Sequence, residues 1–548
     1  MKKTKAVSIM LTGILAMGTL LAACSKEEGG QAVESSPTAK TNQPRTKLKL
    51  FMADSGLPHP SGVDPSNNSF INIIEDYANV DLSLEVPSAQ DFKTKVDLLL
   101  ASGNLPDILH TTYAVDAEAR AREGAFIDLK KYYDKSPMVQ KYITPEMMEF
   151  ARDPLAPAGT GYWRIPMSNA KFMNGSGVVA RYDLIEKYNG GKYPETVDEW
   201  IDLLRKIKKA QPDTPVFSNR VINDKLLNYG GLPIYYWYGA LPYEYRVQSG
   251  KVVSNFTLPE FKAATEKMKM LYSEGIFDIE FAVVDAKKWI EKYVYNDVLF
   301  SVDSPSAVIQ EYIFESQFYK ETPSLKSRVL DMAPSLTKYP AELKDVKYTW
   351  GKMLNPIRGG HSLLISSKTK DPDLAWKVIE GFAAQNLHEA IYWGKEGETF
   401  STQNGKRVPI VDKINDPSRA WALHLGVIMG FEEGIEIKKT IVEQNIGKVY
   451  GQVSTNLDKV AGEAKKGGYP LTAFYVPSDA AKNKAVESRE FISKTTAEAI
   501  MGKITMQQFD ERVKEFVSKY GFMYDEMTKY INDNKDALRK KGVVEVDW

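Results

Sequence analysis

The chain has 548 residues, 43% of them hydrophobic and 26% charged, and its 71 basic and 71 acidic side chains give a formal net charge of zero. This composition excludes a disordered, coiled-coil, collagen-like or polytopic membrane protein, and the length predicts more than one domain. The zero net charge gives no support for nucleic-acid binding, and a single cysteine with only five histidines excludes a disulfide framework or a cysteine-based metal site.

The lone cysteine, Cys24, ends an amino-terminal segment with the three parts of a secretory signal. Three lysines within the first five residues make its start positive, and an apolar run follows over residues 6–23. The run closes with Leu-Ala-Ala-Cys, which resembles the lipobox of bacterial lipoproteins. We therefore expect residues 1–23 to be a signal peptide and Cys24 to be lipidated. The alternative is a transmembrane anchor, for which a run of 18 residues is only just long enough.

Residues 24–46 contain no aromatic side chain and are rich in Ser, Thr, Gln, Gly and Pro. Such a composition cannot bury enough apolar surface to order the chain, so we expect a flexible tether. The two segments together predict an extracytoplasmic protein that is held at the bacterial cell membrane through lipid alone.

From residue 47 the hydrophobic pattern alternates between the two-residue period of strands and the period of helices. The predicted elements are strands over 48–52, 80–86 and 105–109 and helices over 70–77 and 90–102. This alternation is typical of an α/β layer with a mainly parallel sheet. Ligands of open α/β sheets bind beyond the carboxyl ends of the strands, which here are the loops around Asp54 and 110–113.

A second block begins near residue 163. Residues 178–182 are strand-like, and Thr196 with Glu199 three residues later forms a capping box, which predicts the start of a helix. Further helices are predicted over 259–274, 373–385 and much of 484–537.

Signatures of catalysis are mostly absent. The chain has no nucleophile elbow, no P-loop and no zinc-protease motif, since the His388-Glu389 pair lacks the second histidine. Residues 532–536 resemble half of a calcium loop, but Ala537 replaces the required glycine, so we expect a solvated turn. No metal, cofactor or catalytic residue is predicted. A glycosidase with paired carboxylates stays open, because a chain with 71 acids offers many acidic pairs.

Aromatic residues are abundant, with 9 Trp, 29 Tyr and 22 Phe. Sugar rings stack their C–H faces on aromatic planes, and the polar ends of Tyr and Trp suit sugar hydroxyls. Tyr235 and Trp237 lie in the densest aromatic stretch, 230–245, and are candidates for a sugar site, with core packing as the alternative. If residues 235–238 form a strand, their side chains alternate between its faces, and at most half of them can line one cleft.

Several short motifs follow the lipobox. They are Leu100-Ala-Ser-Gly-Asn-Leu-Pro-Asp-Ile108, Glu123-Gly-Ala-Phe-Ile-Asp-Leu129, Arg181-Tyr-Asp-Leu184, Tyr193-Pro-Glu-Thr-Val-Asp-Glu-Trp200 and Trp393-Gly-Lys-Glu-Gly397. In this order they resemble the family 1 extracellular solute-binding proteins of bacterial ABC importers, over nearly all of residues 47–530. The closest resemblance is to the long oligosaccharide-binding branch, which includes alginate-oligosaccharide binders.

The resemblance implies an α/β, two-lobed fold like that of periplasmic binding proteins, with a hinge and a ligand cleft between the lobes. Mapped by motif, the first lobe takes residues 47–167 and about 335–390, and the helix-rich second lobe takes 168–334 and about 391–548. Alginate binders carry a calcium loop after the helix that follows the Pro-x-Thr-x-Asp-Glu segment. Residues 211–216 are shorter here and hold one carboxylate, so no calcium ion is predicted.

The resemblance also implies ligand contacts in the first lobe and at the first crossing between the lobes, near residues 163–166. Asp54 and Tyr113 follow first-lobe strands, where cleft-facing positions are expected and ordinary turn residues are the alternative. Trp163 and Arg164 lie at the crossing, and we expect Trp163 to stack on a sugar.

In the second lobe, Asp303 and Ser304 match a family ligand loop, although the family has a tryptophan where this chain has Ser304. Arg358, beside the later crossing, suits a uronate carboxylate. For the glycines of the Gly-x-Glu-Gly loop the alternative is an ordinary backbone turn. The remaining candidates lie beside that crossing or flank that loop: Trp350, Arg358, His361, Tyr392, Trp393, Glu396 and Phe400.

The function implied is that of a lipid-anchored, monomeric protein that is not an enzyme and binds no nucleic acid. It would capture an oligosaccharide in the cleft and deliver it to the transmembrane subunits of an ABC permease. Two alternatives remain. A surface glycoside hydrolase or lyase would turn over its sugar, and a binder of peptide or protein ligands would not recognise sugar at all.

Overall fold

The computed structural model describes residues 44–54, 59–88, 91–167, 175–285, 298–305, 329–339, 361–414, 421–426, 446–467 and 475–540, with single residues and pairs elsewhere between 288 and 308 and between 416 and 443. Arg45–Trp548 forms one compact unit. The predicted signal peptide, Cys24, Trp350 and Arg358 lie outside the described residues.

One sheet has five strands in the order β2-β1-β3-β10-β4. β1 runs parallel to β2 and to β3, as the sequence predicts, whereas β10 is antiparallel to β3 and to β4. Leu48 and Leu50 of β1 are buried while Lys47 and Lys49 are exposed, which is the alternation that predicted the strand. The strands are β1 (Thr46–Phe51), β2 (Val80–Glu85), β3 (Ile108–Thr111), β4 (Ile165–Pro166) and β10 (Ser362–Ile365).

Helices follow these strands along the chain. The side chain of Asn68 caps α1 by accepting hydrogen bonds from two backbone N–H groups, and Asn79 ends the helix with a φ of 56°. α1 packs on α13 so closely that a Cβ on Gly381 would lie 2.8 Å from a methyl carbon of Ile74. The helices are α1 (Ser69–Ala78), α2 (Phe92–Ser102), α3 (Ala114–Arg122), α4 (Lys130–Tyr133), α5 (Pro137–Tyr142), α6 (Pro145–Ala151), α13 (Pro372–Gly381), α14 (Gln385–His388) and the π-helical η7 (Glu389–Trp393).

A hydrophobic cluster joins these helices to the five-stranded sheet. Its buried members include Leu50 of β1, Ile74 of α1 and Leu363 of β10. It also takes in Tyr392 and Trp421, which lie beyond residue 390, where the motifs end the first lobe. Chain that follows η7 therefore shares the core of the first sheet. The elements in this stretch are β11 (Phe400–Gln403), β12 (Lys406–Pro409), α15 (Val411–Ile414) and α17 (Leu423–Gly426).

A second sheet has three antiparallel strands in the order β8-β5-β9. Its core is aromatic: Trp200 of α8 stacks on Trp237 with ring centroids 5.0 Å apart and meets Phe300 of β8 edge-on at 6.0 Å. Thr196 accepts from the backbone N–H of Glu199, as the capping box predicts, but the carboxylate of Glu199 accepts from Glu195 instead of Thr196. The elements are β5 (Gly177–Arg181), α7 (Tyr182–Asn189), α8 (Val197–Ala210), β8 (Phe300–Asp303) and β9 (Leu330–Met332).

The aromatic stretch after α8 is helical, which corrects the strand considered for residues 235–238. A short 3-10 turn, η2 (Tyr229–Gly231), leads into α9 (Pro233–Trp237). Pro233 stands in the first turn, where its missing N–H costs nothing and its fixed φ suits a helix. The N–H of Tyr238 then donates to the carbonyl of Ile234. The aromatic side chains therefore follow a helical period, and most of them enter one core.

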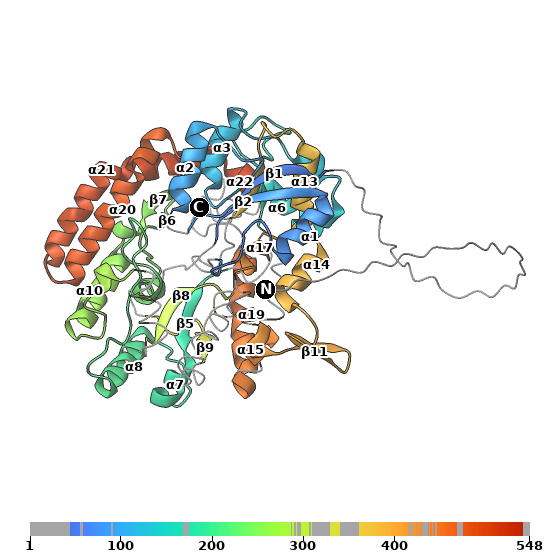
Figure 1. Cartoon of the computed structure of the whole chain (residues 1–548). Coiled ribbons are helices and arrows are strands. Elements are labelled where there is room, and N and C mark those ends of the chain that lie inside the picture. The colour runs from blue at the N-terminus through green and yellow to red at the C-terminus, as the bar shows by residue number, and fades with distance from the viewer. Residues whose placement is uncertain are drawn as a thin grey trace, which may run out of the picture. The chain divides into compact units, whose positions relative to one another are not determined.

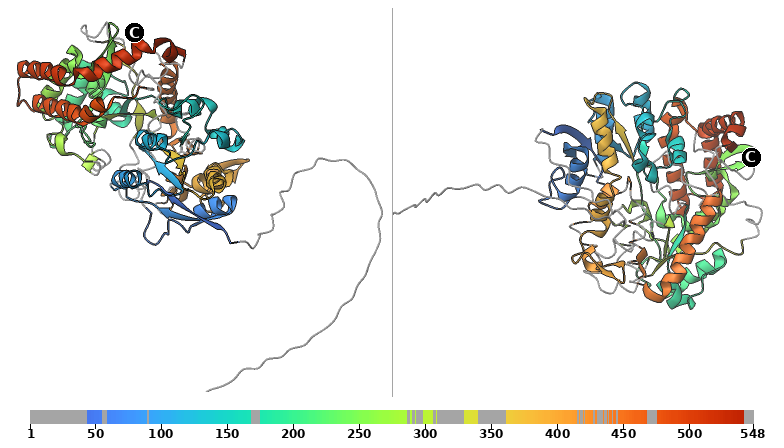
Figure 2. Two further views of the ribbon diagram at one scale, coloured as in Figure 1. Left: turned by 90° about the horizontal axis from the view of Figure 1, so that it is seen from above. Right: turned by 90° about the vertical axis from the view of Figure 1, so that its right-hand side faces the viewer.

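The carboxyl-terminal helices α20 and α21 lie side by side and pack with α10 (Figure 1, Figure 2). α21 begins with a complete capping box, in which Thr505 and Gln508 each accept from the other's backbone N–H. Among the described residues, none of the helices has the length and apolar character needed to cross a bilayer. The elements are β6 (Tyr245–Gln248), β7 (Lys251–Ser254), η3 (Asn255–Thr257), α10 (Pro259–Ser273), η4 (Phe281–Val283), η8 (Gly447–Val449), α19 (Tyr450–Gly467), α20 (Asp479–Ile500), α21 (Met506–Asp533) and α22 (Lys535–Lys540).

Candidate functional site

Polar side chains gather at the carboxyl edge of the parallel strands of the first sheet. Asp54 follows β1 and is 6% exposed, and His110 lies within β3 and is fully buried. Because β10 is antiparallel to β3, with Ser362 opposite Thr111, His361 reaches the same edge from the start of β10. This is the position at which open α/β sheets bind ligands.

The two histidines at this edge form a directed hydrogen-bond chain. The backbone N–H of Ala53 donates to Nδ1 of His110 across 3.0 Å, so that nitrogen carries no hydrogen. Nε2 of His110 therefore carries the hydrogen, which it donates to Nδ1 of His361 across 2.8 Å. Burial lowers the pKa of His110 well below its usual value and that of His361 to about 4, so both rings are neutral at pH 7.

Two more histidines join this cluster. The ring of His59 lies 4.4 Å from that of Trp421 and 5.5 Å from that of His424. The Nδ1–H of His424 donates to the backbone carbonyl of Trp421, and burial lowers the pKa of His424 to about 4. Nε2 of His424 and Nε2 of His59 are buried and have no hydrogen-bond partner among the described residues. We call His59, His110, His361 and His424 the histidine cluster.

Four of the five histidines of the chain thus form two pairs, His110 with His361 and His59 with His424, and the charge of His361 acts on His424. Sequence reasoning identified only His361 and the loop that holds His110. His110 and His361 are 251 positions apart. No local pattern connects such residues, because only the order of strands in the sheet brings them together. The small number of histidines was the one available signal.

Tyr113 and Trp163 lie beside this edge as half-buried aromatic rings, both packed against the same small hydrophobic cluster around Phe92 and Leu109. Tyr113 stacks on Phe92 with ring centroids 6.2 Å apart. The indole N–H of Trp163 donates to the carboxylate of Asp153 across 3.2 Å. The Nζ of Lys93 also lies 4.9 Å from the centroid of the Tyr113 ring. Both residues remain candidates for stacking.

Arg164 has a different role from the predicted one. Its guanidinium group pairs with the carboxylate of Glu118 at 3.2 Å and donates to the hydroxyl of Ser362 at 3.0 Å. The side chains of Arg164 and Glu118 are 0% and 2% exposed. A buried, paired charge of this kind holds α3 against β10 and is not available to a ligand, which corrects the prediction for Arg164.

A second group of polar and aromatic residues lies at the end of β8. Asp303 stands opposite Gly177 of β5 and accepts from the backbone N–H of Ser304 across 2.7 Å. Burial raises the pKa of Asp303 to about 6, although the nearby charge of Arg220 lowers it. The predicted pair Asp303 and Ser304 is therefore a partly buried turn with a carboxyl group that titrates near neutrality.

Arg220 and Tyr229 belong to this second group and were missed by sequence reasoning. The guanidinium carbon of Arg220 lies 5.0 Å from the ring centroid of Tyr229, and the buried Nε of Arg220 has no hydrogen-bond partner among the described residues. Tyr229 has a φ of 46°, in the left-handed region that a bulky residue rarely adopts. Its ring lies 6.2 Å from that of Trp289.

The candidates around the Gly-x-Glu-Gly loop separate into core and surface. Tyr392 is buried, and a Cβ added to Gly426 would collide with its hydroxyl group. Trp393 and Phe400 meet edge-on at 5.5 Å, with the guanidinium group of Arg407 over both rings. The exposed Glu396 lies between two glycines of positive φ, Gly394 and Gly397, so the backbone turn is what these glycines provide.

Tyr235 and Trp237 are both core residues, which was the alternative to a ligand contact. Tyr235 is fully buried, and its hydroxyl is hydrogen-bonded to that of Thr265 across 3.0 Å. Trp237 is 4% exposed and stacks on Trp200. Neither ring presents a face to a ligand, which corrects both predictions.

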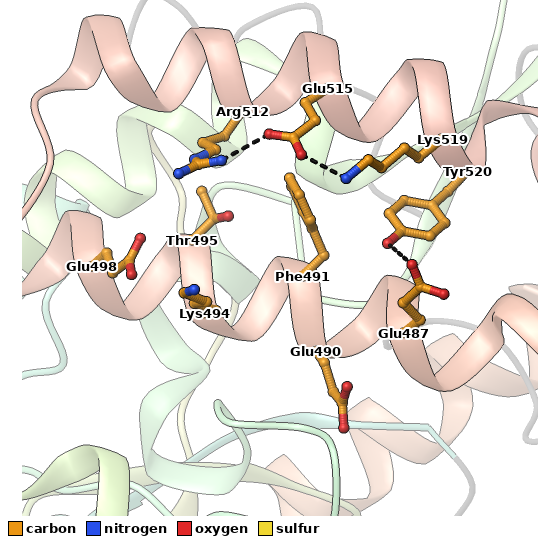
Figure 3. A pocket seen from close by; sticks show the side chains of 10 residues that line it. All are labelled: Glu487, Glu490, Phe491, Lys494, Thr495, Glu498, Arg512, Glu515, Lys519 and Tyr520. Carbon is orange, nitrogen blue, oxygen red and sulfur yellow. Dashed lines mark hydrogen bonds and ion pairs between the residues drawn. The ribbon is translucent and has the colours of Figure 1, made fainter.

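Grooves occur elsewhere on the surface. One of about 340 Å³ lies between α20 and α21, where Glu515 pairs with both Arg512 and Lys519 (Figure 3). Glu487 accepts from the hydroxyl of Tyr520 in the same groove. Within the described part of the chain, no group of three or more His, Cys, Asp or Glu side chains is placed to hold a metal ion.

Comparisons with known proteins agree on one family. Residues 64–383 match the family model described as bacterial extracellular solute-binding protein. Lipoprotein LipO of Bacillus subtilis is 25% identical over 305 residues, which cover 53% of this chain and 55% of LipO. The match thus spans about half the length of that relative. The polygalacturonan/rhamnogalacturonan-binding protein YtcQ of the same organism is 22% identical over 530 residues, 94% of this chain and 96% of YtcQ.

A solved structure extends the likeness to nearly the whole chain. The ABC-transporter substrate-binding protein FusA of Streptococcus pneumoniae, in complex with kestose, superposes with a TM-score of 0.62 at 19% identity. The superposition covers 90% of this chain and 100% of FusA. At this level of identity the likeness shows a shared fold.

Proposed function

The chain belongs to the bacterial extracellular solute-binding protein family, and on that premise we propose that it captures an oligosaccharide between two lobes and delivers it to an ABC transporter. The family places the chain among extracytoplasmic binding proteins, and the predicted two-lobed α/β fold is confirmed. The names of its relatives support a carbohydrate ligand: one is named for binding polygalacturonan and rhamnogalacturonan, and another was solved with kestose.

The observation that carries the proposal is the pairing of half-buried aromatic rings with buried polar groups at a sheet edge. Tyr113 and Trp163 are half-buried rings packed on the small hydrophobic cluster around Phe92 and Leu109, and Asp54 and His110 are buried polar residues at the ends of the adjoining strands. A sugar needs both kinds of partner, since its C–H faces stack on aromatic planes and its hydroxyl groups must be hydrogen-bonded when they leave water. Asp303, Arg220 and Tyr229 would supply the corresponding contacts from the second sheet.

We assign the lobes by sheet. The first lobe is built on β1 to β4 and β10, and the second on β5, β8 and β9, which supports residues 47–167 with about 335–390 and 168–334 as the two chain divisions. Because Tyr392 and Trp421 pack in the core of the first sheet, we extend the first lobe beyond residue 390. Closure on a sugar needs no chemistry, since the ligand stabilises the closed population.

The protein acts by binding and not by catalysis in this proposal, and it works as a monomer with a transient permease interface. Relatives named as binding proteins support this. Turnover of an oligosaccharide by the purified protein would instead favour a glycoside hydrolase or lyase.

We also propose that Cys24 anchors the protein to the membrane through lipid after removal of residues 1–23. The test is a Cys24→Ser variant expressed in a Gram-positive host. Wild-type protein should stay with the membrane fraction and incorporate labelled palmitate, whereas the variant should incorporate none. Labelling of both proteins, or of neither, would contradict the assignment.

The first experiment on function is thermal unfolding of the full chain with a panel of neutral and uronate-bearing oligosaccharides. A ligand at a hundred times its dissociation constant adds ~2.7 kcal/mol to the native state, which shifts the midpoint by a few degrees. A dose-dependent rise with intact sugar supports the proposal. Consumption of the sugar would favour an enzyme, and no shift over the whole panel would favour peptide or protein ligands.

Trp163→Ala provides a direct test of the stacking surface. Losing one aromatic platform should weaken the sugar that binds best in the panel by about tenfold, which is ~1.4 kcal/mol. Tyr132→Ala is the matched control, because Tyr132 is also half-buried and stacks on an aromatic partner, Trp376, at 5.5 Å. Equal losses in the two variants would remove Trp163 from the site.

A further inference from the structure

The histidine cluster offers a hydrogen-bond donor whose direction the protein fixes. Nδ1 of His110 accepts from the backbone N–H of Ala53, so the ring hydrogen of His110 is on Nε2. That nitrogen therefore donates to His361 and cannot accept from it. Nδ1 of His361 must therefore remain a lone pair, and the only hydrogen on the neutral His361 ring is on Nε2. His361 is partly accessible, while His110 is fully buried behind it.

The same cluster contains an acceptor without a partner. Nδ1 of His424 is used as a donor to the carbonyl of Trp421, which leaves a lone pair on Nε2. This nitrogen is buried and unpaired among the described residues, and native proteins rarely leave a buried acceptor in that state. The charge of His361 acts on His424 through space. A donor on a bound ligand would satisfy this nitrogen.

The charge around the cluster selects against an anionic group. The rings are uncharged at neutral pH, and the charged group that acts on His59 is the carboxylate of Asp54. The guanidinium group of the nearby Arg164 is already paired with Glu118. A uronate carboxylate would meet a neutral ring and a second carboxylate here, whereas sugar hydroxyls can donate to Asp54 and accept from His361.

We propose that His361 is a specificity-determining contact that donates its Nε2–H to a hydroxyl oxygen of an uncharged sugar unit, and that His110 is the positioning residue that fixes His361 as a donor. The inference rests on the proposed function and deepens it, because it selects neutral sugar units for this end of the site.

The first test uses the wild-type full chain with ¹⁵N-labelled histidine, since five ring systems give a spectrum that single variants can assign. Without sugar, His110 and His361 should both be in the Nε2–H form at pH 7. Neutral probes (kestose, raffinose and xylotriose) should include one that shifts the Nε2 resonance of His361, and trigalacturonate should not. The inference is overturned if His361 is in the Nδ1–H form or doubly protonated. It is also overturned if a neutral probe binds without shifting the Nε2 resonance of His361.

The second test measures dissociation constants for the neutral probe that binds. His361→Phe should weaken it about tenfold, while His361→Gln, whose side-chain amide also donates, should stay within about threefold of wild type. His110→Phe should weaken binding and let the His361 ring populate both neutral tautomers. Replacing a residue with a merely structural role would not change the tautomer of His361. Equal effects of Phe and Gln at position 361 would contradict the proposed donor role.

A matched control is His388→Phe. His388 is also buried and has a lowered pKa, but both its nitrogens are occupied, with Nε2–H donating to the carbonyl of Phe382 and Nδ1 accepting from Tyr142. This variant should lose stability and keep its affinity. If only trigalacturonate binds, the inference fails and the proposed function stands. If no oligosaccharide binds, the proposed function fails and the sugar contact fails with it.

Discussion

Arg164 and Glu118 form an ion pair of 3.2 Å in which both side chains are almost completely buried. The pair connects the residue directly before β4 with α3, and Arg164 also donates to Ser362 of β10. The sequence predicted Arg164 as a ligand contact because it follows Trp163 at the crossing. Because Arg164 is buried, we infer instead that it stabilises the packing of α3 against β10.

Removing one member of this pair should be costly. Arg164→Met leaves the carboxylate of Glu118 buried without its partner, which should lower the free energy of unfolding by about 3–5 kcal/mol. The double variant Arg164→Met with Glu118→Leu should lose less than the single one, because no charge stays unpaired. Denaturant unfolding measures both. Lys93→Ala, which breaks an exposed pair with Asp97, is the control and should cost less than 1 kcal/mol. A single variant as stable as this control would contradict the assignment.

Stability should fall as the pH drops below neutrality. Burial lowers the pKa of His361, His388 and His424 to about 4 in the folded protein, against 6.5 in the unfolded chain. Between these values the unfolded chain binds protons that the folded protein refuses, so acid favours unfolding. Each ring should remove about 3 kcal/mol between pH 6.5 and 4, at 1.36 kcal/mol per unit of pKa.

Denaturant titrations at pH 7, 5.5 and 4 measure this loss. His388→Phe should be less stable than wild type at pH 7 and should show a shallower decline towards pH 4, because one titrating ring is gone. A free energy of unfolding that is constant from pH 7 to 4 would contradict the neutral, buried state of these rings.

Asp303 and Asp331 are two carboxyl groups of the second sheet whose removal should change stability in opposite directions. Burial raises the pKa of Asp303 to about 6, so its ionisation destabilises the folded protein as the pH rises through that value. Asp303→Asn removes this effect and should raise the free energy of unfolding at pH 7 by about 1–2 kcal/mol. It should also weaken sugar binding if Asp303 contacts the ligand as proposed.

Asp331→Leu should do the reverse. One oxygen of Asp331 accepts from the hydroxyl of Tyr193 and from the amides of Gln452 and Asn456. A leucine in its place would leave these three donors without their acceptor, so stability should fall by about 1–3 kcal/mol while sugar affinity is kept. Parallel unfolding and binding titrations of both variants compare them. Loss of affinity in Asp331→Leu but not in Asp303→Asn would show that the ligand contact was assigned to the wrong carboxylate.

The two glycines of the Gly-x-Glu-Gly loop should differ in their tolerance of alanine. Gly394 has φ 77° and ψ −124°, and an added Cβ would lie 2.5 Å from atoms of Arg419 and of Thr399. Gly397 has φ 80° and open space around its Cβ position. Gly397→Ala should cost about 1–2 kcal/mol from backbone strain alone, and Gly394→Ala distinctly more. Midpoints of thermal unfolding test the order, and equal midpoints would show that the collision is relieved.

Local features were predictable from the sequence because their cause is local. The alternation of Leu48 and Leu50 with lysines gave β1, and Thr196 gave the start of α8. The aromatic stretch at 235–238 was ambiguous because its residues suit a strand or a helix equally. Two features favour the helix: Pro233 in the first turn, and the packing of Trp237 on Trp200.

The motifs also led to the right family, since their order along the chain needs no folding to be recognised. Composition alone excluded cysteine-based metal chemistry, and the lipobox pattern still supports an anchored protein whose amino terminus lies outside the described residues. Asp54 and Tyr113 could be predicted as candidates because loops after strands can be located from the strands themselves, and Trp163 because the resemblance places the first crossing there.

Burial and long-range pairing were decided only by the tertiary structure. Whether Arg164 faces a ligand or Glu118, and whether Tyr235 lines a cleft or fills a core, depends on elements that arrive from distant parts of the chain. His110 meets His361 only because β10 inserts beside β3, 251 positions later in the sequence. Hydrogen bonds and desolvation act over a few ångströms in space, so the sequence names the groups and the fold decides which of them meet.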